Sequence, residues 1–195
     1  MAEKKRILIV DDIPRNFELA REQLGEEYDL TFATTPLEAI SYITGKPDRS
    51  VAYQKFFLPK ALAAGLPIEG EYKWTDERRR ISDEAEAEFL ALITGKQFDV
   101  VMTDCMMPIE HGDSKAWDGE IPGGLVVAIV ALRKNVPTII IVSNKDHHKH
   151  PILHMMDAIE GPGRIAHGCR MEWVKRNGED VIEKQWKKTL EYFSS

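Results

Sequence analysis

Two apolar runs that each end in aspartate carry the residues best suited to chemistry. Residues 6–10 run into Asp11 and Asp12, and residues 98–103 run into Asp104. Continuous apolar runs of this length fit strands buried on both faces of a parallel sheet, and such sheets bind ligands just beyond the carboxyl ends of their strands. The three carboxylates would converge there, and their mutual repulsion favours a divalent cation. The pattern predicts a Mg²⁺-assisted phosphoryl site.

A structural interpretation competes with the functional one at the first pair. A lone aspartate after a strand is more often the N-cap of the next helix than a ligand, so Asp11 or Asp12 can cap a helix that begins near Pro14. The occurrence of both, together with Asp104 after another strand, favours the functional interpretation.

Composition and charge exclude several classes of function. The chain has 195 residues, of which 43% are hydrophobic and 30% charged, and its net charge is -6, which disfavours direct binding to nucleic acid. Its two cysteines, Cys105 and Cys169, have no paired spacing and fit a reducing compartment. No stretch reaches the roughly 18 apolar residues of a membrane span. We therefore expect a cytoplasmic protein.

Hydrophobic periodicity predicts an alternation of strands and helices along the chain. An alternation of this kind is typical of an α/β fold with a doubly wound parallel sheet. Helix signals include Pro14 in a first turn, Gly25 and Gly45 as helix ends, and a capping box at Thr35 to Glu38. The predicted strands are 6–10, 28–32, 98–103, 138–143 and 172–175, and the predicted helices are 14–24, 36–43, 125–134, 152–159 and 181–193.

Residues 45–95 interrupt this alternation, between the second helix and the third strand. We expect a single domain over 1–195 in which this segment is a partly helical insertion with an amphipathic stripe at Ile81, Ala85, Phe89, Leu92 and Ile93. Arginines 78–80 in it are either a docking patch for an acidic partner or part of a salt-bridged helix face. The spacing of Arg79 to Asp83 and Arg80 to Glu84 favours the salt-bridged face.

Several of these features, taken in order, resemble the receiver domain of two-component response regulators, the CheY-like superfamily. They are the motif Ile-Leu-Ile-Val-Asp-Asp at 7–12, Asp104 followed four residues later by Pro108, Ser143 at the end of the next strand, and Lys175 in the last strand. The resemblance covers residues 5–43 and 96–193. It implies a flavodoxin-like sheet of five parallel strands in the order 2-1-3-4-5.

The resemblance also implies a role for each site residue. Asp104 would be the nucleophile and phosphoacceptor, because a carboxylate can attack phosphorus without a general base. Mg²⁺ would be held by Asp11, Asp12, Asp104 and the backbone carbonyl of Met106.

Two further residues would contact the transferred phosphoryl group. Lys175 would pair with it as a point charge, and Ser143 would donate a hydrogen bond to one of its oxygens. The phosphoryl donor would be a phosphohistidine on a histidine kinase or a histidine phosphotransfer protein. Phosphorylation would then modulate contacts with a downstream protein target, and the chain would be a stand-alone signalling domain rather than an enzyme, apart from its own phosphorylation and dephosphorylation.

Three departures from the family pattern keep alternatives open. Arg176 stands where receivers usually have proline, Asn144 where a small residue is usual, and Glu172 where an aromatic residue is common. These residues favour a pseudo-receiver, an interaction module that keeps the fold without phosphorylation. A Mg²⁺-dependent phosphohydrolase is the other alternative, although its Asp-x-Asp signature is absent after the first strand.

Histidines 147, 148, 150 and 154 raise a second metal hypothesis. They lack a matching cysteine or carboxylate spacing, and Pro151 makes an early helix start unfavourable. A polar loop is the favoured interpretation.

Overall fold

The chain forms two compact units. A computed structural model of the chain describes residues 3–68, 74–105, 107, 123–143, 163–164, 170–175 and 184–194. Unit 1 comprises residues 1–39 and 97–195, and unit 2 comprises residues 40–96. The predicted insertion at 45–95 falls within unit 2.

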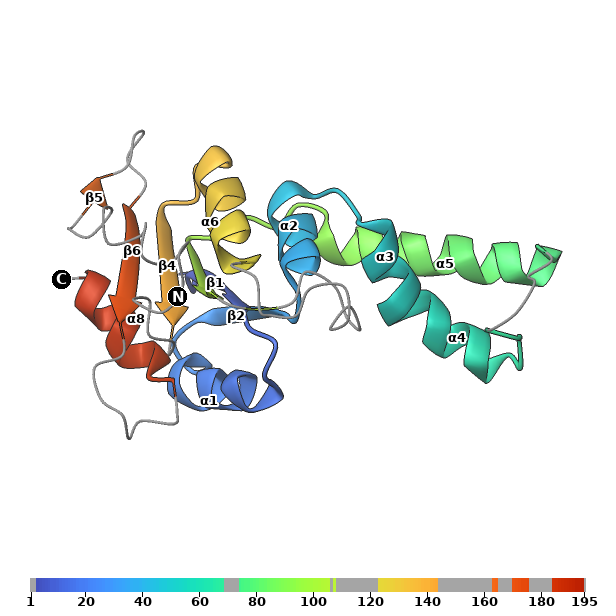
Figure 1. The fold of residues 1–195 in the computed structure, drawn as a ribbon, viewed down its shortest axis with the longest axis horizontal. Helices are drawn as coiled ribbons and strands as arrows, with labels where there is room; N and C mark the ends of the chain where they lie inside the picture. Colours follow the sequence, from blue (N-terminus) through green and yellow to red (C-terminus); the bar gives the residue numbers. More distant parts are fainter. Residues whose placement is uncertain are drawn as a thin grey trace. The chain divides into compact units, whose positions relative to one another are not determined.

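Unit 1 is built on a six-stranded sheet in the order β2-β1-β3-β4-β6-β5 (Figure 1). The first five strands of this order pair in parallel, and β5 pairs with β6 in the antiparallel sense. The short antiparallel β5 is not among the predicted strands, so the predicted fifth strand is β6. The five parallel strands therefore confirm the predicted order 2-1-3-4-5. The strands are β1 (Arg6–Val10), β2 (Asp29–Ala33), β3 (Val100–Asp104), β4 (Thr138–Ser143), β5 (Gly163–Arg164) and β6 (Arg170–Lys175).

The central strands β1, β3 and β4 are largely apolar because helices cover both of their faces. Helices α1 (Pro14–Leu24) and α8 (Trp186–Ser194) lie on one face, and α6 (Gly123–Arg133) lies on the other (Figure 1). Side chains alternate along a strand, and one set packs with α1 and α8 in a single core. That set contains Ile7, Ile9, Val100, Met102, Ile140 and Val142, which meet Phe17, Ala20, Trp186 and Leu190 from the helices.

The helix signals in the sequence act largely as predicted. α1 buries Phe17, Ala20 and Leu24, but Ile13 is the N-cap residue and is 45% exposed. α2 (Pro36–Thr44) begins at the predicted capping box, where the Thr35 hydroxyl accepts from the Glu38 backbone N–H. The Glu38 carboxylate accepts from the backbone N–H of Thr34, one residue before the position the motif predicts. The predicted helix 152–159 lies outside the described residues.

Unit 2 is helical and has a core of its own. Its elements are α3 (Arg49–Ala52), the π-helix η1 (Tyr53–Phe57), α4 (Leu58–Ala63) and α5 (Asp76–Ile93). Phe57, Ala61, Ile81 and Ala85 form the core. The predicted stripe of α5 is buried except for Leu92, which is 41% exposed.

The arginines of α5 have separate structural roles. Arg78 is buried, donates to the Pro67 carbonyl and lies over the Phe57 ring. Arg80 pairs with Glu84 on the exposed face, as the i, i+4 spacing predicts. Among the described residues, no helix is long and apolar enough to cross a membrane.

Candidate functional site

The register of the sheet brings Asp11 and Asp104 to the same edge. Val10 pairs with Thr103 between β1 and β3, so the residue after each lies at the carboxyl end of its strand. Ile7 and Ile9 face α1 and α8, as do Val100 and Met102. Because alternate residues share a face, Asp11 and Asp104 continue these two series toward α1 and α8.

Asp11, Asp12 and Asp104, here called the acidic cluster, can share a metal ion. One carboxylate oxygen of each lies within 4.8 Å of the others; Asp11 and Asp104 are buried and Asp12 is exposed. Carboxylate oxygens are the ligands that hard divalent cations prefer, so the donor set of the acidic cluster fits such an ion.

Asp11 also holds the start of α1. Its Oδ1 accepts hydrogen bonds from the Ile13 backbone N–H and from the Asn16 side-chain amide, both at 2.9 Å. The structure does not give Asp11 the predicted N-cap role, because Ile13 is the N-cap residue of α1 and Asp11 accepts from the N–H of that residue. These hydrogen bonds use Oδ1 and leave Oδ2 for other partners.

Lys184 supplies a buried positive charge to the acidic cluster. Its side chain is 1% exposed, and its ammonium pairs with Asp11 Oδ2 and, at 3.0 Å, with Asp104 Oδ2. Lys184 lies two residues before α8, on the face of the sheet to which both aspartates point. With all three carboxylates ionised, the cluster and this lysine carry a net charge of about -2, which a divalent cation would neutralise.

Burial makes Asp104 harder to ionise. Desolvation raises the pKa of Asp104 to about 6. The positive charge of Lys184 opposes this increase, and the negative charge of Asp11 adds to it. Its Oδ1 accepts from the Cys105 backbone N–H at 2.7 Å. The carboxylate is nevertheless ionised at pH 7 and above, where it can act as a ligand or as a nucleophile.

The first turn of α6 packs directly on the main chain of Asp104. A Cβ atom at Gly124 would lie 1.7 Å from the Asp104 carbonyl oxygen, so only glycine fits. The Gly124 N–H also donates to the Cys105 carbonyl at 3.0 Å. Cys105 is fully buried, and burial raises the pKa of its thiol to about 12, so the thiol stays protonated.

The other predicted site residues are described only in part. Ser143 ends β4 and pairs with Lys175 at the end of β6, one residue beyond the pair formed by Asp104 and Val142. The structure places their backbones at the same edge of the sheet as Asp104, and the roles predicted for their side chains remain predictions. Met106, Asn144, Arg176 and the four histidines lie outside the described residues.

Lys184 and Asn16 are the site residues that sequence reasoning missed. A predicted helix over 181–193 makes Lys184 one more polar residue on a helix, whereas α8 begins at Trp186. The available signal was its place two residues before Trp186, a fully buried aromatic residue that begins α8. Because Trp186 packs in the core against the sheet, a lysine two residues before it lies close to the sheet.

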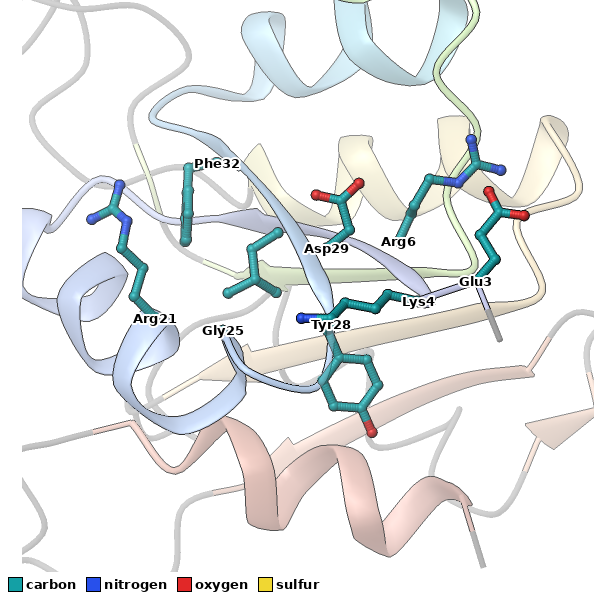
Figure 2. Close-up of a pocket in the computed structure, with 9 residues that line it drawn as sticks. Glu3, Lys4, Arg6, Arg21, Gly25, Tyr28, Asp29 and Phe32 are labelled. Carbon is teal, nitrogen blue, oxygen red and sulfur yellow. The ribbon is translucent and has the colours of Figure 1, made fainter. Parts of the chain in front are cut away.

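A separate cavity of about 590 Å³ lies beside β2, at the edge of the sheet (Figure 2). Both acidic and basic side chains line it, including Asp29, Lys4 and Arg6. The Arg21 guanidinium there lies over the Phe32 ring, 4.3 Å from its centroid. No member of the acidic cluster lines this cavity, and its mixed charges do not converge on one point.

No protein-family model matches the sequence, and no curated protein is significantly similar to it. Among solved structures, the chain is similar to a CheY-like response regulator receiver domain protein from Methanospirillum hungatei, with 14% identity, a TM-score of 0.45, and coverage of 98% of this chain and 92% of that one. It is also similar to the chemotaxis protein CheY4 of Vibrio cholerae, with 14% identity, a TM-score of 0.44, and coverage of 98% and 97%. A third similar structure is the response regulator TrrA of Thermotoga maritima in complex with Mg²⁺ and beryllofluoride, with 18% identity, a TM-score of 0.42, and coverage of 97% and 96%.

Proposed function

We propose that the chain is a phosphoacceptor receiver domain of a two-component phosphorelay and that Asp104 accepts the phosphoryl group. The observation that carries the proposal is the meeting of three carboxylates and a buried lysine at the carboxyl edge of a parallel sheet. An acidic cluster that can hold a cation, beside a buried ammonium, suits a phosphoryl group in transfer, because catalysis of this step is mainly positioning and charge neutralisation.

In the proposed reaction an oxygen of Asp104 attacks phosphorus. A P–O bond to the carboxylate forms, the P–N bond of the donor phosphohistidine breaks, and the electron pair of that bond stays with the donor imidazole. Lys184, which already contacts Asp104 Oδ2, is assigned the role of neutralising charge on the phosphoryl oxygens. The resemblance assigns the same role to Lys175, and matched substitutions of the two lysines distinguish the two assignments.

The acidic cluster would hold Mg²⁺, with the Met106 carbonyl as the further ligand that the resemblance implies. When bound, the ion would supply positive charge to the carboxylates and to the oxygens of the phosphoryl group. Asp11 is prepared for this role because Ile13 and Asn16 already orient its carboxylate. Asp12, the exposed member, is accessible to solvent.

The phosphoryl group would act as a switch on protein contacts. It adds negative charge beside Lys184, whose neighbours along the chain begin α8. A histidine kinase or histidine phosphotransfer protein would be the donor, and a downstream protein that contacts α8 and β6 would be the target. The domain would act in the cytoplasm as a signalling protein, with no catalysis other than its own phosphorylation and dephosphorylation.

Incubation with acetyl phosphate and Mg²⁺, followed by intact-mass measurement, tests the proposal. We expect a mass increase of one phosphoryl group that requires Mg²⁺ and is absent in Asp104→Asn. Glu22→Gln, an exposed substitution on α1, is the control and should label like the wild type.

The two alternatives predict different results in the same experiment. A pseudo-receiver would give no adduct with acetyl phosphate or with a phosphohistidine donor. A phosphohydrolase would release inorganic phosphate over many turnovers without accumulating an adduct. Either result would overturn the phosphoacceptor proposal.

A further inference from the structure

α1 carries two side-chain amides that reach toward the residues of the site. Asn16 donates to Asp11, and Gln23 contacts the segment that carries Lys184. The two residues are seven positions apart, which is close to two helical turns, so they lie on the same face of α1. α1 therefore contacts both the carboxylate and the chain segment of the lysine that pairs with it.

The amide of Gln23 binds the main chain on both sides of Trp186. Its Nε2 donates to the Lys184 carbonyl at 3.1 Å, and its Oε1 accepts from the Lys187 backbone N–H at 3.2 Å. The second bond satisfies a donor in the first turn of α8, which has no partner within its own helix. The Trp186 indole N–H, in turn, donates to the Asn16 carbonyl at 3.0 Å.

The position of the Lys184 main chain matters because its ammonium is almost completely buried. A buried ammonium is tolerated only in good geometry with its partners, and a lysine side chain has many rotamers to lose. The two hydrogen bonds of Gln23 fix the Lys184 carbonyl and the turn that follows it, and so they restrict the position of the Lys184 Cα atom from which the side chain extends. The free energy that holds the ammonium between Asp11 and Asp104 then depends partly on an uncharged residue that contacts neither carboxylate.

We propose that Gln23 is a positioning residue that holds Lys184 on Asp11 and Asp104 by fixing the chain at the start of α8. Its consequence for phosphoryl chemistry rests on the proposed function, whereas the positioning itself can be measured in the unphosphorylated protein.

Amine labelling followed by peptide mass spectrometry tests the positioning. The rate of acetylation of Lys184 by a water-soluble succinimidyl ester is compared among the wild type, Gln23→Met and Glu22→Met, which places the same residue at the neighbouring exposed position. Loss of two hydrogen bonds predicts an increase on the order of tenfold or more in Gln23→Met and no increase in Glu22→Met. Lys60 in unit 2 is an internal reference that should label equally in all three.

Two further measurements separate positioning from general loss of stability. Ile139→Val destabilises the core without touching α8 and should leave Lys184 labelling unchanged under native conditions. Gln23→Glu keeps an acceptor for Lys187 but loses the donor to Lys184, so it should increase Lys184 labelling while α8 stays folded. Unchanged Lys184 labelling in Gln23→Met, or an equal increase in Ile139→Val, would overturn the proposal.

Metal binding and analogue binding then connect the positioning to function. Release of the ammonium should strengthen Mg²⁺ binding, because Lys184 competes for two of the carboxylates, and should weaken binding of beryllofluoride, a phosphoryl analogue that needs the counter-charge. A general structural defect would weaken both. If the wild type binds neither probe, the proposed function fails, while the labelling result still decides the role of Gln23.

Discussion

Asp104 shows at the scale of a single residue how the site lowers the stability of the fold. The pKa of Asp104 is about 6 in the folded protein, compared with 3.8 for an ordinary aspartate. Between these values the folded state binds more protons than the unfolded chain, so the free energy of unfolding falls as the pH rises, and the full cost persists above pH 6. A difference of roughly two pKa units corresponds to about 3 kcal/mol.

Asp104→Asn should therefore stabilise the metal-free protein in a pH-dependent way. Asparagine keeps an oxygen for the Cys105 N–H and carries no charge, so we expect a gain in the free energy of unfolding of up to about 3 kcal/mol above pH 6 that disappears below about pH 4. Urea unfolding without Mg²⁺ at several pH values measures it. A gain that does not vary with pH would show that the Asp104 charge is not its cause.

The two candidate lysines can be distinguished by matched substitutions. Lys184→Met leaves two buried carboxylates without their partner, and breaking such a pair costs about 3–5 kcal/mol in the free energy of unfolding. We expect Mg²⁺ to recover part of this loss and the adduct with acetyl phosphate to fall at least roughly tenfold, the effect of about 1.4 kcal/mol. Lys175→Met should retain most of the adduct. The reverse ranking would support the assignment that the sequence resemblance implies.

At the scale of elements, the contact between α6 and β3 fixes the main chain of Asp104. Gly124→Ala would place a Cβ against the Asp104 carbonyl, which is backbone and cannot rotate away. We expect the free energy of unfolding to fall by about 1–3 kcal/mol or more, because α6 must move away from the end of β3. We expect Mg²⁺ binding to weaken for the same reason. Denaturation and metal titration test this. Val126→Ala, on the exposed side of the same helix, should change neither quantity measurably.

The elements also show which features can be predicted from the sequence. β1 and β4 can be predicted because residues 7–10 and 139–142 are continuous apolar runs, as strands buried on both faces require, and polar residues stand only at the strand ends. β5, with two residues, has no pattern of its own and exists through its pairing with β6. The three short helical elements between Arg49 and Ala63 likewise lack a full amphipathic repeat.

The site residues likewise divide into those that the sequence predicts and those that only the packing of helices brings to the site. Asp11, Asp12 and Asp104 can be found in the sequence because each follows a recognisable strand. Lys184 contacts Asp11 across 173 positions of the chain, and its position depends on how α8 packs on α1. Trp186 indicates only that this helix packs on a core and does not identify its partner, so a motif written for the end of the last strand selects Lys175 instead.

At the scale of the whole molecule, the two units have separate cores, and all residues assigned to the site belong to unit 1. Phe89 is fully buried in α5 of unit 2, where its ring stacks on Phe56 with the centroids 5.2 Å apart. Phe89→Ala should destabilise unit 2 by about 3–5 kcal/mol. Leu92→Ala, exposed on the same helix, is the control and should have little effect.

The same variant tests whether the site depends on the stability of unit 2. A ligand stabilises what it binds by RT ln(1 + [L]/Kd), so Mg²⁺ at a hundred times its Kd should stabilise unit 1 by about 2.7 kcal/mol. If the acidic cluster is built by unit 1 alone, Phe89→Ala should leave the Mg²⁺ affinity and this stabilisation unchanged below its unfolding transition. Asp12→Asn should weaken both without affecting unit 2. A loss of Mg²⁺ affinity in Phe89→Ala while unit 1 remains folded would mean that unit 2 contributes to the site, and the phosphoacceptor mechanism would then have to include it.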